Sequence, residues 1–211
     1  MALYLDSASI DDAKTVMSWG WVKGITTNPK LLAQSDRPPA ETLDALGGIC
    51  SGELYYQLTA TTLAGMLSEA YQAAGIIGPQ TVLKIPATPL GFQALTQLSP
   101  RIDCSVTGIY HPAQAAVAAE GGAKYAIAYV NRATQHLGDG IALVAAMAAI
   151  LKGSPTKILA ASIKSPDEAA AALTAGATHL TLPKDQLLAL TTHPLSEATV
   201  AEFAAQGCGL I

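Results

Sequence analysis

Residues 53–86 read ELYYQLTATTLAGMLSEAYQAAGIIGPQTVLKIP, and this stretch contains one complete strand–helix–strand unit. Its outer segments, Glu53–Leu58 and Thr81–Pro86, are short and rich in aromatic and aliphatic residues, which is typical of buried strands. Between them, Thr62–Ala74 has apolar residues at the 3.6-residue spacing of a helix. The stretch therefore predicts two parallel strands joined by a helical crossover.

Units of this kind recur along the chain at a spacing of roughly 25 residues, as in α/β barrels. Two further helical segments are Pro112–Ala119 and Ile141–Leu151. The other strand segments are Leu3–Asp6, Gly24–Thr27, Asp103–Gly108, Tyr125–Val130, Lys157–Ser162 and His179–Leu182. Eight such units predict an α/β fold, a parallel sheet closed into an (α/β)8 barrel as one domain over residues 1–211.

An open, doubly wound sheet is the alternative architecture for alternating strands and helices. That fold usually has fewer strands and often a glycine-rich first turn. Here the first turn is Asp6-Ser7-Ala8, and Gly138-Asp139-Gly140 lacks the third glycine of a dinucleotide-binding motif. The barrel is therefore the favoured fold.

Helix boundaries agree with this division of the chain. Asn28-Pro29 places a capping side chain before a proline, and the segment 165–168, Ser-Pro-Asp-Glu, predicts a capping box. Gly153 and Gly176 stand where helices should end. After the eighth unit, Ser196–Ala205 predicts an extra C-terminal helix, followed by a short tail, Gln206–Ile211.

Composition excludes several classes of partner. Half of the residues are hydrophobic, and the net charge of −4 is scattered, which argues against nucleic-acid binding. The first strand is predicted to begin within Met1–Asp6, so we expect no signal peptide. The apolar run Gly140–Leu151 is too short to span a bilayer, so we expect no membrane segment.

Metal and disulfide chemistry find little support in the sequence. The three cysteines are far apart and odd in number, as expected of reduced thiols in a cytoplasmic protein. The four histidines lack ligand spacing, and those at 111 and 193 precede prolines, as turn or capping residues do. We therefore expect neither a metal nor a cofactor. The residues concerned are Cys50, Cys104, Cys208, His111, His136, His179 and His193.

Polar side chains stand at the C-terminal ends of seven of the eight predicted strands. In an α/β barrel all the strands are parallel, so their C-terminal ends lie on one face. The active site of such a barrel is built on this face. One polar strand end is ordinary solvation of the rim, but a ring of them predicts a site. The ring comprises Asp6, Thr26, Asn28, Gln57, Lys84, Thr107, Tyr129, Asn131, Arg132, Ser162 and Lys164.

Lys84 gives the sharpest indication of chemistry because it lies inside an otherwise apolar strand. Loss of hydration lowers the pKa of an amine, and a neutral amine can attack a carbonyl to form a Schiff base. The alternative is a structural ion pair with Asp6 across the barrel. The surrounding polar ring favours the reactive lysine.

Tyr129 is the candidate general acid and base, with Gln57 and Thr107 able to hold a water molecule beside it. A core aromatic with a satisfied hydroxyl is the alternative for such a tyrosine. Three further groups, a guanidinium, a hydroxyl and an ammonium, suit a phosphate dianion. They belong to Arg132, Ser162 and Lys164, and exposed rim charges are the alternative for them.

Five segments together resemble the transaldolase family, and they are closest to its small branch, which includes fructose-6-phosphate aldolase. The resemblance covers nearly the whole chain, and the Thr-Thr-Asn-Pro and Lys-Ile-Pro sequences carry most of its specificity. The segments are residues 3–6 (LYLD), 24–29 (GITTNP), 82–86 (VLKIP), 129–132 (YVNR) and 159–162 (LAAS).

The resemblance implies a class I mechanism without metal, on a fourth-strand lysine that corresponds to Lys84. It implies that Asp6 is the carboxylate near that lysine and that Asn28 binds a donor hydroxyl. Arg132 and Ser162 would hold phosphate. Small-branch members assemble as pentamers paired into decamers, so the resemblance also implies a homo-oligomer. An extra apolar helix after a complete barrel agrees with assembly, although it could instead pack on its own barrel.

Two positions separate the activities within this family, and this chain departs from the family pattern at others. Transaldolases carry glutamate and typically phenylalanine where this chain has Gln57 and Tyr129, whereas the aldolase carries glutamine and tyrosine. The chain departs from both at Ile127, where they have serine or alanine, and it has Ser105 where the aldolase has leucine. The tail is also shorter than in the aldolase, and Ala128 replaces a proline.

The sequence thus predicts an aldolase that splits the C3–C4 bond of fructose 6-phosphate into dihydroxyacetone and glyceraldehyde 3-phosphate. The alternatives are a transaldolase, which passes the dihydroxyacetone unit to a second sugar phosphate, and a barrel that binds without catalysis. We expect Ile127 and Ser105 to face inward on adjacent strands, where Ile127 favours hydroxyacetone as donor unless Ser105 supplies a hydrogen bond.

Overall fold

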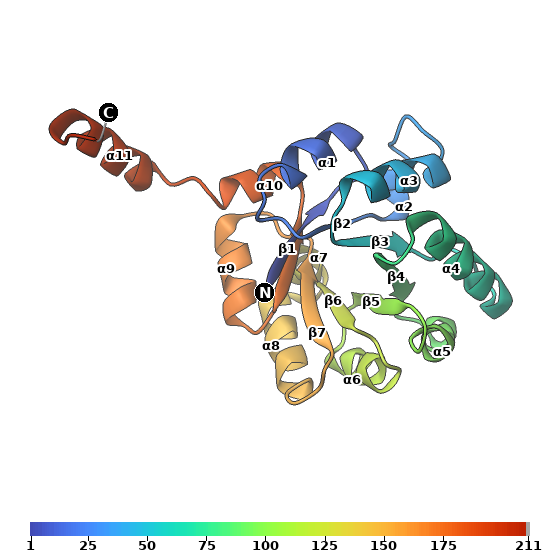
Figure 1. Ribbon diagram of the computed structural model, residues 1–211. Helices are drawn as coiled ribbons and strands as arrows, with labels where there is room; N and C mark the ends of the chain where they lie inside the picture. The colour runs from blue at the N-terminus through green and yellow to red at the C-terminus, as the bar shows by residue number, and fades with distance from the viewer. Residues whose placement is uncertain (210–211) are drawn as a thin grey trace.

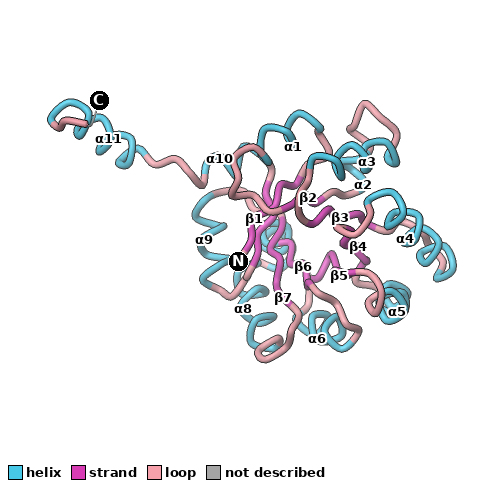
Figure 2. The backbone as a smooth tube through the Cα atoms, viewed as in Figure 1, coloured by secondary structure: helices cyan, strands magenta, loops and turns pink. Residues whose placement is uncertain are grey.

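The computed structural model describes residues 1–209, in which eight parallel strands form a closed barrel in sequence order (Figures 1 and 2). This confirms the predicted (α/β)8 barrel. Leu210 and Ile211, the last residues of the predicted tail, lie outside the described residues. The strands are β1 (Ala2–Asp6), β2 (Gly24–Thr26), β3 (Glu53–Gln57), β4 (Thr81–Pro86), β5 (Asp103–Ile109), β6 (Tyr125–Tyr129), β7 (Lys157–Ala161) and β8 (His179–Leu182).

Helices surround the strands as an outer layer, which Figure 2 shows as a cyan ring around the magenta barrel. Most connections between consecutive strands contain one helix, and those after β2 and β6 contain two. The helices are α1 (Ile10–Met17), α2 (Pro29–Leu32), α3 (Pro39–Ile49), α4 (Leu63–Ile77), α5 (Pro89–Leu98), α6 (Pro112–Glu120), α7 (Val130–Leu137), α8 (Gly140–Ile150), α9 (Pro166–Thr174), α10 (Lys184–Ala189) and α11 (Pro194–Gln206).

Strand boundaries agree with the sequence to within one residue, but the connection after β6 does not. The predicted strand Tyr125–Val130 ends at Tyr129, and α7 begins at Val130 without an intervening loop. Asn131 and Arg132 therefore lie in the first turn of a helix and not at a strand end, which corrects the prediction. The predicted helix Thr62–Ala74 also continues to Ile77.

Alternation along each strand divides the apolar residues between two packed regions. Side chains such as Leu5, Leu83 and Leu180 belong to the core between strands and helices. Inward-facing residues fill the barrel itself and form a separate cluster. Because every second residue points inward, the period-2 pattern decides which polar groups reach the interior. The interior cluster comprises Tyr4, Tyr55, Val82, Tyr125, Ile127, Leu159 and Ala161.

The N-terminal end of the barrel is closed by hydrogen bonds to one carboxylate, that of Glu53. It accepts from the hydroxyls of Tyr4 at 2.7 Å, Tyr55 at 2.8 Å and Tyr125 at 2.9 Å, and from Lys124 Nζ at 2.6 Å. Burial by itself would raise the pKa of Glu53, but these donors, Lys124 first, hold it below its ordinary value.

The predicted caps are observed with one correction. Asn28 Oδ1 accepts from Leu31 N at 3.1 Å and begins α2, and Ser165 caps α9. The reciprocal half of the capping box predicted at Ser165 is different, because Glu168 Oε2 accepts from the backbone N–H of Lys164 at 2.6 Å. Gly176 has a φ of 112° just after α9, a conformation that favours glycine.

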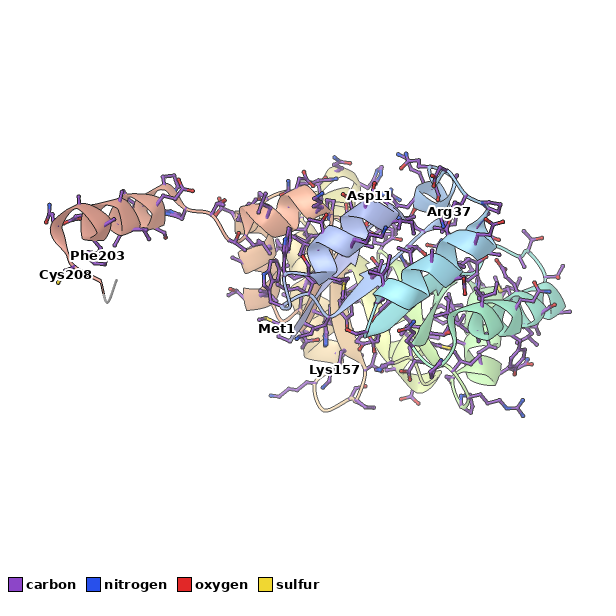
Figure 3. All side chains as sticks on the ribbon, turned by 45° about the horizontal axis from the view of Figure 1, so that its top comes forward. Met1, Asp11, Arg37, Lys157, Phe203 and Cys208 are labelled. Atoms are coloured by element: carbon purple, nitrogen blue, oxygen red, sulfur yellow. The ribbon has the colours of Figure 1, made fainter. Side chains whose placement is uncertain are left out.

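Helix α11 confirms the predicted C-terminal helix and stands apart from the barrel (Figures 1 and 3). None of its thirteen residues is buried within the described chain. Leu195, Val200 and Phe203 are 72%, 68% and 68% exposed. The alternative in which this helix packs on its own barrel therefore does not describe the structure.

Within residues 1–209, no single helix is long and apolar enough to cross a membrane. The pair α7 and α8, bent by 112° at the break between them, satisfies such a criterion together by length and composition.

Candidate active site

Lys84 lies in the interior of the barrel, on the fourth strand and near its C-terminal end. Its side chain is 3% exposed, and its register partners are Gln57 on β3 and Ser105 on β5. Leu83 and Ile85 point the opposite way, into the core beneath the helices. The alternation of the strand therefore carries one amine into an environment that is otherwise closed to water.

The amine of Lys84 donates to the backbone carbonyl of Thr27 at 2.8 Å. Within the described residues it forms no ion pair with Asp6, so the structural ion pair considered from the sequence is not present. Burial lowers the pKa of Lys84, and the negative charge of Asp6 opposes part of this effect. The arrangement favours a neutral, nucleophilic amine.

Asp6 is oriented by hydroxyl groups on two other strands. Thr26 Oγ1 donates to Asp6 Oδ1 at 2.9 Å, and Thr181 Oγ1 lies 2.6 Å from Thr26 Oγ1. Thr181 was missed by the sequence analysis because β8 ends in Leu182-Pro183. A signal was available, since Thr181 is a polar residue between two leucines that face the helices.

Tyr129 and Thr107 form a direct pair, with 2.8 Å between Thr107 Oγ1 and Tyr129 Oη. Burial raises the pKa of Tyr129, and the hydrogen bond with Thr107 opposes it. The register between β5 and β6 shifts between Val106 and Ile109, and Gly108 has a φ of 75° there. Such a bulge re-aims neighbouring side chains, and it lies directly beside Thr107.

Gln57 on β3 is paired in register with Lys84, and its buried Oε1 has no hydrogen-bond partner among residues 1–209. The backbone that follows it is held by Glu69 on α4. Glu69 accepts from Thr59 N at 3.0 Å, Ala60 N at 2.8 Å and the hydroxyl of Tyr56 at 2.8 Å. Glu69 thus fixes the loop after β3, a role that the helical spacing of its segment did not predict.

Asn28 and Ser105 each use one polar atom within the protein. The Oδ1 of Asn28 caps α2, so its amide N–H groups remain as donors. Ser105 is 0% exposed and donates to the carbonyl of Leu83 at 3.0 Å. Ile127 is 1% exposed on the neighbouring strand, in the interior cluster with Tyr129 packed against it. Both side chains therefore face inward, as predicted.

Arg132 and Ser162 lie on adjacent connections, which the hydrogen bond from Asn131 N to Ser162 O at 3.0 Å joins. The Arg132 guanidinium stands 5.3 Å from the centre of the Tyr129 ring. Ser162 has a φ of 59°, the one positive φ of a non-glycine residue in the described chain. Strained backbone of this kind is concentrated at functional sites. Lys164 follows with an exposed side chain.

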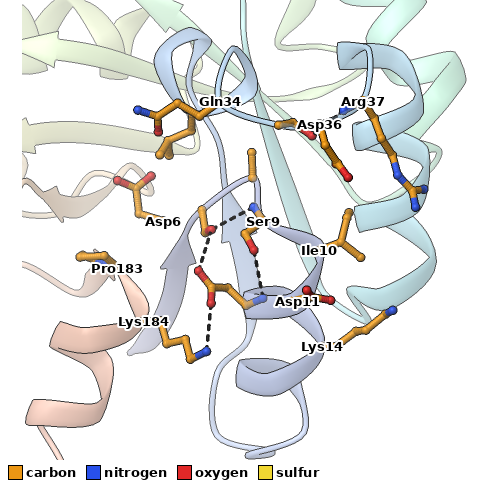
Figure 4. A pocket seen from close by; sticks show the side chains of 15 residues that line it. Asp6, Ser9, Ile10, Asp11, Lys14, Gln34, Asp36, Arg37, Pro183 and Lys184 are labelled. Carbon is orange, nitrogen blue, oxygen red and sulfur yellow. Dashed lines mark hydrogen bonds and ion pairs between the residues drawn. The ribbon is translucent and has the colours of Figure 1, made fainter.

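A cleft of about 580 Å³ opens beside Asp6, between the connections that follow β1, β2 and β8. Figure 4 shows Gln34 and Arg37 on one side of it and Lys184 on the other. Lys184 forms an ion pair with Asp12 at 3.0 Å. The cleft shares Asp6 with the polar ring, and Lys84 is not among the residues that line it.

Two histidines have the structural role that their prolines predict. His111 and His193 cap α6 and α11, with their ring nitrogens accepting from backbone N–H groups. The three cysteine thiols are free, two of them buried. In the part of the chain that the structure describes, no cluster of three or more His, Cys, Asp or Glu side chains has the geometry of a metal site.

The fold and this site define an α/β-barrel protein whose strand ends converge on a buried amine. A family model described as Transaldolase/Fructose-6-phosphate aldolase matches residues 3–208. The chain belongs to this family, as the resemblance of its motifs implied.

Curated relatives named as members of this family align with the chain over almost their whole length. A probable transaldolase of Kosmotoga olearia is 34% identical, over 96% of this chain and 94% of that protein. One from Phenylobacterium zucineum is 35% identical, over 97% and 95%.

Solved structures with the same fold are more distant. A mandelate oxidase variant aligns with a TM-score of 0.64 at 14% identity, over 88% of this chain and 65% of that one. Inosine 5′-monophosphate dehydrogenase from Legionella pneumophila aligns with a TM-score of 0.61 at 15% identity, over 86% and 58%. The chain spans less than two thirds of these chains, and the likeness concerns the fold.

Proposed function

We propose that the protein is a class I aldolase that cleaves fructose 6-phosphate to dihydroxyacetone and glyceraldehyde 3-phosphate through Lys84. The observation that carries this proposal is a buried lysine with a lowered pKa that is not neutralised by an ion pair. Such an amine has the properties of a Schiff-base nucleophile. The reaction is reversible, so the same site would also form the bond.

The proposed reaction starts when the neutral Lys84 amine attacks the ketone carbon. A carbon–nitrogen bond forms, and Tyr129 supplies, through a water molecule, the proton with which the ketone oxygen leaves as water, giving an iminium ion. The C3–C4 bond then breaks, its electron pair moves toward the iminium nitrogen, and the C4 hydroxyl passes its proton through the water to the Tyr129 phenolate. Glyceraldehyde 3-phosphate leaves, and a protein-bound enamine remains. Protonation of the enamine carbon and hydrolysis by water release dihydroxyacetone and regenerate the amine.

Tyr129 is the proposed proton carrier in these steps, acting through a water molecule held with Gln57 and Thr107. Its raised pKa keeps the resting phenol protonated at neutral pH, so it can first supply the proton for dehydration. The phenolate that remains can then accept the proton of the C4 hydroxyl and later deliver it to the enamine carbon. The free oxygen of Gln57 suits this role because it can accept a hydrogen bond from that water. Asp6 is the proposed carboxylate partner of the nitrogen intermediates.

Substrate binding is proposed for the remaining members of the polar ring. The amide of Asn28 would donate to a hydroxyl of the dihydroxyacetone unit, with Thr26 and Ser105 completing that end of the pocket. Arg132, Ser162 and Lys164 would bind the phosphate, where a planar guanidinium gives two charge-assisted hydrogen bonds. Small sugar phosphates are therefore the proposed partners, and a reduced cytoplasmic setting suits the free thiols.

Transaldolase activity is the second candidate, and the names of the curated relatives favour it. Gln57 and Tyr129 favour the aldolase, because transaldolases of this family carry glutamate and typically phenylalanine there. The test is product analysis from fructose 6-phosphate, with and without erythrose 4-phosphate. Release of free dihydroxyacetone without the second sugar supports the aldolase, whereas turnover that requires it would identify a transaldolase.

We also propose that α11 packs against a second copy of the chain, in a pentamer or decamer. Its exposed Leu195, Val200 and Phe203 form apolar surface on a helix that its own barrel does not cover. Light scattering tests this at micromolar concentration, with a chain truncated before Pro194 as comparison. A monomeric full-length protein would contradict the proposal.

A further inference from the structure

Strand β8 contributes one polar side chain to the barrel interior, that of Thr181. It is 2% exposed, and its neighbours Leu180 and Leu182 face the helices. Its register partner on β1 is Tyr4, whereas Thr26 is paired with Asp6 one layer higher. The side chains of Thr181 and Thr26 therefore meet inside the barrel, across the strand that carries Asp6.

The direction of the hydrogen bonds between these groups is fixed by counting hydrogens. Thr26 Oγ1 donates to Asp6 Oδ1 at 2.9 Å, and a hydroxyl has one hydrogen. In the 2.6 Å contact between the two threonines, Thr181 is then the donor and Thr26 the acceptor. The result is a directed chain from Thr181 through Thr26 to the Asp6 carboxylate, and polarised chains of this kind strengthen each of their bonds.

The last residue of β2 binds the carboxylate, and the residue that follows the strand binds the amine. The side chain of Thr26 binds Asp6, and the carbonyl of the next residue, Thr27, accepts from Lys84 Nζ at 2.8 Å. An ion pair between Asp6 and Lys84 would stabilise the ammonium form and remove the nucleophile. The hydrogen bond from Thr26 restrains the Asp6 carboxylate, which forms no ion pair with Lys84 within the described residues.

We infer that Thr181 is a positioning residue for the proposed Schiff-base chemistry, because its hydroxyl orients Thr26 and thereby keeps Asp6 from pairing with Lys84. This inference rests on the proposed function. Within the described residues Thr181 forms no hydrogen bond with Lys84. Its proposed effect on the lysine is therefore transmitted through Thr26.

Titratable and charged groups face this hydrogen-bonded chain from the barrel and from the cleft beside Asp6. In the barrel, Asp6 is on β1, Lys84 on β4, Tyr129 on β6 and Arg132 on α7. The charged residues that line the cleft with Asp6 are Asp11, Asp12 and Lys14 on α1, Asp36 and Arg37 after α2, and Lys184 on α10. The charge of Asp6 acts on both Lys84 and Tyr129, and Arg132 acts on Tyr129. Movement of Asp6 toward Lys84 therefore favours the ammonium and requires a higher pH for the reactive amine.

The experiment measures the rate of borohydride trapping with dihydroxyacetone, and kcat and KM for fructose 6-phosphate, over a range of pH. Thr181→Val removes the hydroxyl at nearly constant volume. We expect the trapping rate and kcat to fall roughly tenfold with KM little changed, as for loss of one strong hydrogen bond. The alkaline shift of the trapping profile should be about one pH unit.

Two further variants separate positioning from folding. Thr181→Ser restores the hydroxyl and should restore both the rate and the pH profile. Thr156→Val is the matched control, since Thr156 is 4% exposed and its hydroxyl donates to the Ala123 carbonyl at 2.7 Å, away from Lys84. It should behave as the wild type. Thr181→Ala repeats the test without a methyl group against Thr26 if the valine variant does not fold.

The inference is overturned if Thr181→Val and Thr181→Ala match the wild type. It is equally overturned if both lose activity without a shift in the pH profile, if serine does not restore them, or if Thr156→Val falls to the same extent. A wild-type protein that forms no adduct would overturn the proposed function itself, which is a different result.

Discussion

At the N-terminal end of the barrel, Glu53 accepts hydrogen bonds from three tyrosine hydroxyls and one ammonium group. At the C-terminal end, Lys84 is more deeply buried, and its amine donates one hydrogen bond within residues 1–209, to Thr27. Both ends of the barrel carry an ionisable side chain in the interior, but only at the N-terminal end does an oppositely charged group, Lys124, balance the charge. A fully bonded buried charge holds structure, whereas an under-bonded one costs stability and is available for chemistry.

Loss of the amine at Lys84 is the largest effect that this comparison predicts. Lys84→Met should reduce turnover of fructose 6-phosphate to background, because no Schiff base can form. The free energy of unfolding should be unchanged or rise by about 1 kcal/mol, since an apolar side chain replaces a buried amine. Steady-state kinetics and denaturant unfolding measure the two quantities. Residual turnover, or a large loss of stability, would make Lys84 a structural residue.

Substitution of Glu53 should have the opposite profile. Glu53→Gln should lower the free energy of unfolding by about 1.5–3 kcal/mol, because several donors lose a charged acceptor, and leave kcat nearly unchanged. Asp103→Asn is the matched control. Asp103 pairs with the same Lys124 at 2.7 Å but is 53% exposed, so its loss should cost about 0.5 kcal/mol or less.

The pH dependence of stability gives a second measure of Glu53. Its pKa in the folded protein is below the ordinary value of 4.5. Its contribution is therefore fully present above about pH 4.5 and is lost as the pH falls through the folded pKa. As the pH is lowered through this range, the free energy of unfolding should fall more steeply for the wild type than for Glu53→Gln. Parallel curves would show that the network does not stabilise the ionised form.

A smaller effect is expected at the phosphate candidates. Arg132→Ala should raise KM for glyceraldehyde 3-phosphate roughly 10- to 100-fold, the value of one or two charge-assisted hydrogen bonds. Free glyceraldehyde serves as the control substrate, because it lacks the dianion. Since Arg132 also stands over the Tyr129 ring, a modest change in kcat for both acceptors is expected. Equal changes in KM would remove Arg132 from the phosphate site.

The smallest effect concerns the choice of donor. Ile127→Ser should raise kcat/KM for dihydroxyacetone relative to hydroxyacetone several-fold, as a hydrogen bond of about 0.5–1.5 kcal/mol allows. Ser105→Ala is the companion variant. In the wild type the Ser105 hydroxyl donates its hydrogen to the Leu83 carbonyl, so Ser105 can only accept a hydrogen bond from the substrate dihydroxyacetone. If Ile127→Ser changes kcat/KM for the two donors equally, the residues at positions 105 and 127 affect packing and not donor specificity.

Much of the barrel could be predicted because alternation and helical spacing are local properties of the sequence. Strand β4 was predicted to the residue, and with it the inward direction of Lys84. The position of Arg132 was not, since nothing in the sequence shows that α7 begins directly after Tyr129. Thr181 was missed because β8 ends in Leu182-Pro183, although its place between two leucines was visible in the sequence. Its contact with Thr26, 155 residues away, could not be predicted, since closure of the barrel brings the two together.

The central claim is that the under-bonded amine at Lys84 is the nucleophile. Borohydride reduction in the presence of dihydroxyacetone, followed by mass mapping of peptides, tests it most directly. The account predicts one adduct, on the peptide that contains Lys84, and none in Lys84→Met. An adduct on another lysine, or no adduct in a protein that still cleaves fructose 6-phosphate, would contradict it.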